Sequence, residues 1–274
     1  MEPTAASRSL YQAARRCLLA TGVDAKLDLT DHTAEAWRAG RLTLSGWTCA
    51  DPIIEAGRPA KPPLVHPSRL PRRRAGSERG RLALIHAIAH IEFNAINLAW
   101  DAVQRFPDLP AGFYDDWIQV AREEVHHFRL LRERLREGGV DYGDFPAHNG
   151  LWEMAMRTAH DPLVRMAMVP RMLEARGLDV TPGIMRRFAD IGDTQTVAAL
   201  QVILDEEVGH VRAGTRWFRH LCEARGVPPE TTYFELLERF VDGPIRCPLH
   251  RQARREAGFS DDELAHLEAL CKAE

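Results

Sequence analysis

The feature that most constrains the fold is a short motif that occurs twice, 83 residues apart. The chain reads Glu-Glu-Val-His-His at 123–127 and Glu-Glu-Val-Gly-His at 206–210. Each copy contains a glutamate followed three residues later by a histidine: Glu124 with His127, and Glu207 with His210. On a helix this spacing places both side chains on one face, about 5–6 Å apart at Cβ. Each copy can therefore present one carboxylate and one imidazole to the same metal ion.

A further glutamate precedes each motif at nearly the same distance. Glu92 lies 32 residues before Glu124, and Glu174 lies 33 residues before Glu207. The chain thus carries an internal repeat in which a glutamate is followed by Glu-x-x-His. In the first copy, two antiparallel helices joined by a short turn would place the carboxylates of Glu92 and Glu124 at a similar level along the helix axes.

Chance does not explain this repeat. With 12 His among 274 residues, about one ExxH pair is expected by chance. Two five-residue matches near the middles of long helices are much more specific. The pair formed by Glu263 and His266 lacks the Glu-Glu-Val context, and it is interpreted as a chance match.

Hydrophobic periodicity predicts an all-α protein. Apolar residues recur at three- and four-residue intervals, and no hairpin or βαβ pattern is found. The stretch 178–192 is expected to be broken by Pro182, Gly183 and Gly192. The pattern predicts four long helices and five shorter ones, at 79–105, 111–137, 161–176 and 193–225, and at 7–21, 32–39, 150–160, 230–240 and 260–272.

Four long helices favour a four-helix bundle over 79–226. A helical extension with a Pro- and Arg-rich strap is expected before it, over 1–78. Short helices that pack on the bundle are expected after it, over 227–274.

The candidate ligands lie in apolar stripes that should face the core. Glu92 shares its helix face with Ile85 and Ile96, and Glu207 shares its face with Leu200 and Ile203. Four carboxylates in a core repel one another and resist ionisation without a counter-charge. Two divalent cations supply four positive charges, and six protein ligands leave open positions for water or dioxygen.

The ligand set resembles that of the ferritin-like diiron-carboxylate proteins. That superfamily takes one Glu from each of two helices and Glu-x-x-His from each of the other two. The matching residues and their order are Glu92, Glu124-x-x-His127, Glu174 and Glu207-x-x-His210. The phrases HAIAHIE, PRMLEARGLDVTP and DEEVGHV resemble an uncharacterised bacterial branch, a ferritin-like domain of unknown function. The resemblance covers about 79–226 and implies a dinuclear site, but it specifies no reaction.

The resemblance also implies a hydrogen-bonding role for the acid that precedes each ligand glutamate. Glu123 would bond His210 and Glu206 would bond His127, which fixes the imidazole tautomer. Relatives usually carry Asp there, and surface exposure of both acids is the alternative. Arg171, three residues before Glu174, is expected to pair with a site carboxylate, to hold an anionic substrate, or to lie solvated on the helix surface.

Other histidines and aromatic residues fit structural roles better than ligation. His86 and His90 lie off the Glu92 face, and His126 points away from its motif. Tyr114, Trp117 and Tyr142 are expected to pack in the core rather than to serve as redox-active groups. Cys247 and His250 form a CxxH without partners, so no zinc site is expected.

Composition excludes several classes of protein. The formal net charge is −3, so no global basic field indicates nucleic acid. No stretch reaches the roughly 18 unbroken apolar residues of a membrane span. The five cysteines are scattered without a CxxC pair, which favours a reducing compartment, and a cytoplasmic location is expected.

The strap at 52–74 is locally basic. Its proline content predicts an extended connector, and its RPAKPP and RLPRRR pieces concentrate positive charge. A solvated strap that wraps the core is the simpler interpretation. A site for an anionic ligand or a phosphate backbone is the alternative.

The predicted function is that of a nonhaem diiron oxidoreductase that activates O₂ and oxidises or hydroxylates a small organic substrate or a modified nucleoside. The cofactor would be two Fe ions, with Mn or a mixed Mn/Fe pair as alternatives, because these ligands suit all of them. Partners would be O₂, the substrate and an electron donor, in a monomer or small homo-oligomer. A non-enzymatic iron-storage protein is the first alternative. A bundle that binds nucleic acid through Arg72, Arg73 and Arg74 of the strap is the second.

Overall fold

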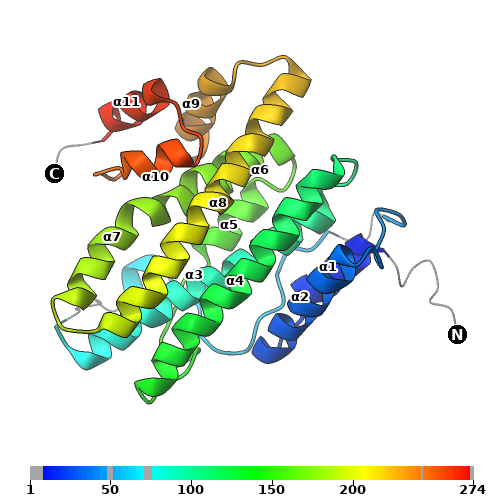
Figure 1. The fold of residues 1–274 in the computed structure, drawn as a ribbon. Helices are drawn as coiled ribbons and strands as arrows, with labels where there is room; N and C mark the ends of the chain where they lie inside the picture. Colours follow the sequence, from blue (N-terminus) through cyan, green and yellow to red (C-terminus); the bar gives the residue numbers. More distant parts are fainter. Residues whose placement is uncertain (1–8, 48–51, 71–75, 242, 272–274) are drawn as a thin grey trace, which may run out of the picture. The chain divides into compact units, whose positions relative to one another are not determined.

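The computed structural model describes residues 9–47, 52–70, 76–241 and 243–271. Within these residues the chain is helical, and the only β-pairing consists of three isolated bridges. The all-α prediction is therefore confirmed for the described part (Figure 1). Two compact units, Met1–Met156 and Arg157–Glu274, are described in turn.

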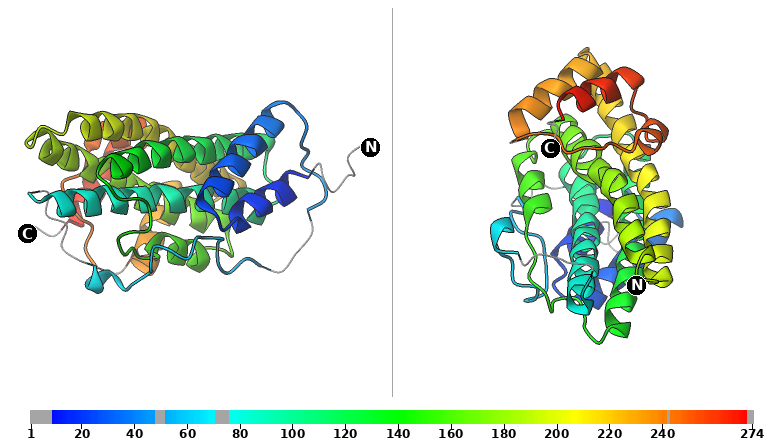
Figure 2. Two further views of the ribbon diagram at one scale, coloured as in Figure 1. Left: turned by 90° about the horizontal axis from the view of Figure 1, so that it is seen from below. Right: turned by 90° about the vertical axis from the view of Figure 1, so that its left-hand side faces the viewer.

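The centre of the first unit is a pair of long helices, α3 (Glu78–Arg105) and α4 (Ala111–Glu137). They lie side by side over their length (Figure 2). The short linker between them makes the pair antiparallel. Tyr114 fixes that linker: its hydroxyl donates to the Phe106 carbonyl at 3.0 Å and accepts from the Leu109 amide at 3.3 Å.

The N-terminal helices cover the α3–α4 pair. Helix α1 (Leu10–Leu19) packs on α3, and α2 (Val23–Arg38) packs on α1 and α4. The prediction of a short helix at 32–39 was wrong about its start, because the helix begins directly after Gly22. Its first half buries Leu27 and the whole side chain of Lys26, so the buried face of the helix begins well before residue 32.

The strap is extended where the structure describes it. Residues 52–70 contain a single 3₁₀ turn, η2 (Pro67–Arg69), as their proline content predicts. The alternative prediction of nucleic-acid binding involves Arg72, Arg73 and Arg74, and these three residues lie outside the described part of the chain. Helix α5 (Gly150–Arg157) follows the loop after α4.

The second unit is built on a long helical path and α8 (Thr194–Arg225). The path runs through α6 (Pro162–Met168), a π-helical segment η3 (Val169–Glu174) and α7 (Ala175–Ala189). The predicted break in 178–192 was wrong at Pro182 and Gly183, because α7 continues through both to Ala189, but the helix does end before Gly192 as predicted. A proline removes one hydrogen bond from a helix, and packing of α7 along α8 compensates for this loss.

The π-helical segment has an identifiable cause. Pro170 has no amide hydrogen, so the regular α-helical bonding cannot continue through it. Short π-helical segments inside α-helices occur frequently at functional sites. This one ends at Glu174, one of the candidate ligands.

A glycine on α8 makes room for the π-helical segment. A Cβ placed on Gly214 would lie 2.3 Å from Cβ of Pro170, whose ring cannot move aside. Only glycine allows α8 and η3 to approach this closely.

Replacing Gly214 with alanine is expected to destabilise the protein by about 1–3 kcal/mol, because the clash forces η3 away from α8. Gly209, on the same helix, is the matched control because a Cβ there meets nothing within 4 Å. Gly209→Ala is expected to stabilise the helix by up to about 1 kcal/mol. Urea unfolding of both variants measures the contrast, and equal effects would refute the close-approach explanation.

Three short helices complete the second unit: α9 (Pro229–Phe240), α10 (Arg251–Glu256) and α11 (Asp261–Ala269). Ser260 and Glu263 form a capping box at the start of α11. A disulfide joins Cys247 to Cys271, with a Cα–Cα distance of 5.9 Å. The sequence pattern predicted no cysteine pair, because the two residues are 24 positions apart and belong to no recognisable motif.

Helix α3 is long and apolar enough to cross a membrane by length and composition alone. However, 72% of its most apolar window is buried inside the structure. This burial is typical of the core helix of a soluble protein.

A buried lysine in the first unit gives a testable pH dependence. Lys26 donates to the carbonyl oxygens of Cys17 at 2.7 Å and Leu18 at 2.9 Å. Burial lowers the pKa of Lys26 from 10.5 to about 7. The unfolded chain therefore binds more protons than the folded protein between pH 7 and 10.5, and stability rises with pH in that window.

The stability of the wild type relative to Lys26→Met is expected to rise between pH 7 and 9, by at most about 1.4 kcal/mol per pH unit. The upper limit of pH 9 avoids Cys17, because burial raises the pKa of this thiol from 9.0 to about 11, and its contribution to the slope above pH 9 is opposite to that of Lys26. Urea unfolding at pH 7, 8 and 9 measures the difference. A constant difference would show that Lys26 keeps its ordinary pKa.

Candidate metal centre

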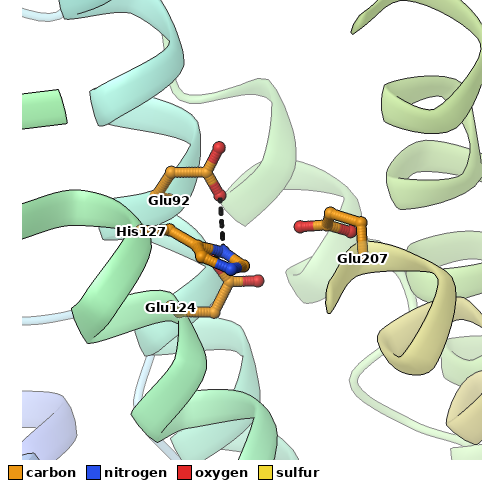
Figure 3. Close-up of side chains that lie close together, drawn as sticks. All are labelled: Glu92, Glu124, His127 and Glu207. Atoms are coloured by element: carbon orange, nitrogen blue, oxygen red, sulfur yellow. Dashed lines mark ion pairs between the residues drawn. The ribbon is translucent and has the colours of Figure 1, made fainter. Parts of the chain in front are cut away.

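The first copy of the motif forms a compact group of ligands in the first unit. Glu92 on α3 and Glu124 and His127 on α4 are all buried. Each offers one ligand atom, and these atoms lie within 4.8 Å of one another. Figure 3 shows the three side chains converging from the two helices. We call this group the first half-site.

The distances in the first half-site suit a shared ion better than direct hydrogen bonds. Nδ1 of His127 lies 3.4 Å from Oε2 of Glu124 and 3.9 Å from Oε2 of Glu92. Hydrogen bonds of this type are about 2.7–3.2 Å long. A ring nitrogen and two carboxylates at these separations can bind one ion between them.

The second copy of the motif lies on α8 in the second unit, and we call it the second half-site. Oε1 of Glu207 is 3.5 Å from Nδ1 of His210, which closely matches the first copy. Glu207 is labelled on its helix in Figure 3. Glu174 ends the π-helical segment η3, which packs against α8. All three side chains are buried, and for Glu207 this burial was predicted from its apolar stripe.

The chemistry of the donor set fits a divalent metal. Buried carboxylates are costly unless a cation or hydrogen-bond donors compensate them. Carboxylate and imidazole ligands together suit Fe, Mn and Zn. The described residues therefore include a buried carboxylate–histidine cluster that can hold a metal ion, although its identity is not determined by these ligands.

The acids that precede the ligand glutamates are less buried than the ligands themselves. Glu123 and Glu206 are half-buried. Glu123 accepts a 2.6 Å hydrogen bond from Nε2 of Gln119, one helical turn earlier. The predicted bonds from these acids to His210 and His127 remain predictions.

The other histidines singled out in the sequence have structural roles. His86 accepts a 2.9 Å hydrogen bond from the Gly143 amide, and His90 bonds Tyr142 and His148. Both therefore hold the loop after α4 against α3. His126 is exposed, in agreement with its exclusion from the ligands.

Arg171 is neither solvated nor paired with a ligand carboxylate. Its side chain is fully buried in the second unit, and Nη2 lies 2.6 Å from Oε1 of Glu263. The guanidinium carbon lies within 5 Å of three ring centroids, those of Phe218, Tyr233 and Phe259. The predicted role of Arg171 in binding an anionic substrate was wrong, because this cage leaves it no access to a substrate.

The Arg171 cage explains what the C-terminal helices do. Tyr233 comes from α9, and Glu263 comes from α11. The hydroxyl of Tyr233 also donates to the Arg171 carbonyl at 3.1 Å. These contacts fix the π-helical segment that carries Glu174, three residues further on. Sequence reasoning missed this role of Glu263, because its capping-box signal gives no indication of a distant arginine.

Together, the helices and the buried cluster define an all-helical protein with a candidate metal-binding centre. The chain belongs to the family described as "Protein of unknown function (DUF455)", whose model matches residues 19–265. An uncharacterized protein of Haemophilus influenzae is 47% identical over 216 residues, covering 76% of this chain and 75% of the relative. No solved structure matches the chain significantly.

Proposed function

We propose that the two half-sites combine into one dinuclear iron centre within a ferritin-like four-helix bundle, and that the protein is an O₂-activating oxidoreductase. The bundle would consist of α3 and α4 from the first unit, and of α8 and the path from α6 to α7 from the second. Mn or a mixed Mn/Fe pair suits the same ligands.

The observation that carries this proposal is the repetition of one geometry. The Glu–His distances of the two motifs are 3.4 and 3.5 Å, on helices of different units. A buried carboxylate from a neighbouring helical segment accompanies each motif. Six ligands of this type, four of them anionic, balance the charge of two divalent ions.

The side chains of this protein would hold the ions and keep bulk water away from them. Glu92, Glu124 and His127 would bind on one side, and Glu174, Glu207 and His210 on the other. Glu124 and His127 are fully buried, so their positions are set by packing before an ion binds. Ferrous ions in such a site would supply electrons for the reduction of dioxygen. The substrate would be a small organic molecule or a modified nucleoside.

Metal analysis followed by exposure to oxygen tests the proposal. Protein purified with iron should contain about two ions per chain by elemental analysis. After anaerobic loading with Fe(II), addition of O₂ should give oxygen uptake and a change in near-UV and visible absorption. A fully loaded protein that consumes no oxygen would exclude an oxidoreductase and would leave a passive metal protein. Large hollow assemblies on size-exclusion chromatography would favour storage.

A further inference from the structure

Residues of the strap line one side of a cavity in the first unit, and none of the metal ligands lines this cavity. The segment 54–65 of the strap lines the cavity together with α3 and is fixed at both ends. Four hydrogen bonds do this: Gly57 N to Leu18 O at 2.9 Å, Trp152 Nε1 to Ile54 O at 2.8 Å, Val65 N to Ala147 O at 2.8 Å and Ala147 N to Pro63 O at 3.1 Å. A Cβ on Gly57 would lie 2.2 Å from the Leu19 carbonyl oxygen, so the strap also lies close against α1.

The cavity between the strap and α3 has a volume of about 70 Å³. A water-sized group requires about 10–15 Å³ on this scale, so the cavity has room for about five or six such groups. Asn97 and Phe93 of α3 contribute to its walls. Asn97 is five residues after Glu92, which places it about 140° around the helix from that ligand. The cavity is therefore distinct from the first half-site.

Two hydrogen-bond acceptors face the cavity from its wall. Asn97 is 2% exposed, and its Oδ1 has no hydrogen-bond partner among the described residues. Tyr142 offers a second acceptor. Its hydroxyl lies 2.8 Å from Nδ1 of His90, and a hydroxyl oxygen has two lone pairs, so it can accept a further hydrogen bond from a ligand. The ligand should therefore carry N–H donors into the cavity.

The aromatic rings that line the cavity favour a ligand whose hydrogen-bond donor is positively charged. Phe93, Tyr142 and Trp152 all line the cavity. An ammonium group over an aromatic face gains about 0.5–2 kcal/mol, depending on how far it is desolvated.

A cation and an anion lie among the exposed residues that line the cavity. Arg58 and Glu55 both belong to the strap, and neither forms an ion pair with another described residue. The guanidinium of Arg58 is the group that can bind a carboxylate with two hydrogen bonds. Glu55 repels a bare anion and favours a ligand that also carries positive charge.

We propose that this cavity binds a small α-amino acid such as glycine, alanine or serine. The ammonium group would donate to Asn97 Oδ1 and to the Tyr142 hydroxyl, and the carboxylate would pair with Arg58. The volume excludes larger side chains. This proposal does not depend on the metal centre or on its reaction.

Calorimetric titration of the full-length protein with alanine tests the proposal, with propionate and ethylamine as matched probes that each lack one charged group. Alanine is expected to bind with a Kd in the micromolar to millimolar range, and each analogue at least tenfold more weakly. No heat with glycine, alanine or serine, or equal binding of propionate, would overturn the proposal.

Three variants locate the binding. Arg58→Gln is expected to weaken alanine binding at least tenfold, whereas Arg41→Gln, an exposed arginine of the same unit, should change it less than twofold. Asn97→Leu should also abolish binding. Because Arg58 is exposed, Arg58→Gln retains the fold even if Asn97→Leu does not. Equal affinities of Arg58→Gln and Arg41→Gln for alanine would contradict the assigned site.

Glu124→Ala should leave alanine binding unchanged. This variant therefore tests the amino-acid site independently of whether the protein binds a metal.

Discussion

Alanine at Glu124 and alanine at Glu207 are expected to have the same effect on metal binding, although the two residues belong to different motif copies. Each variant should retain less than one iron per chain, compared with about two in the wild type. The reason is charge balance: three carboxylates no longer compensate two divalent ions that share one site. Elemental analysis after loading and desalting measures the loss.

Glu133→Ala is the matched control, because Glu133 is an exposed acid on the same helix as Glu124. Its iron content should equal that of the wild type. If Glu124→Ala and Glu207→Ala each kept one tightly bound ion, the half-sites would be two independent mononuclear sites. That result would refute the shared centre.

Replacing Glu263 with glutamine is expected to destabilise the protein by about 3 kcal/mol, because the positive charge of Arg171 then stays buried without its counter-charge. Glutamine keeps the capping interaction with Ser260, so the helix end is preserved. Glu268→Gln on the same helix is the matched control. Glu268 pairs with Arg251 at the surface, and such pairs contribute about 1 kcal/mol or less.

Urea unfolding of these variants distinguishes a buried pair from a surface pair. The double variant Arg171→Met with Glu263→Leu should recover much of the lost stability, because it removes both charges from the aromatic cage. Equal destabilisation by Glu263→Gln and Glu268→Gln would show that the Arg171 charge is not isolated from solvent.

The sequence was sufficient to predict the long helices and the grouping of the first half-site. Glu124 and His127 lie on one helix face because of their spacing alone, and the short turn after Arg105 brings Glu92 beside them. Such relations depend on helical geometry, which is the same in every protein.

The features that the sequence did not reveal depend on contacts between distant residues. Pro182 has the signature of a helix break, but α7 continues through it. The cage around Arg171 uses aromatic rings from three separate segments, so no local pattern indicates it. The same holds for Lys26, whose burial depends on how α2 packs against its neighbours.

X-ray absorption spectroscopy of the iron-loaded protein is the most direct test of the shared centre. The proposed site predicts scattering from a second iron at about 3.5–4 Å, a separation typical of two-metal sites. Oxygen and nitrogen ligands should make up the inner shell, without sulfur. Iron bound at two equivalents per chain with no iron–iron scattering would contradict the account.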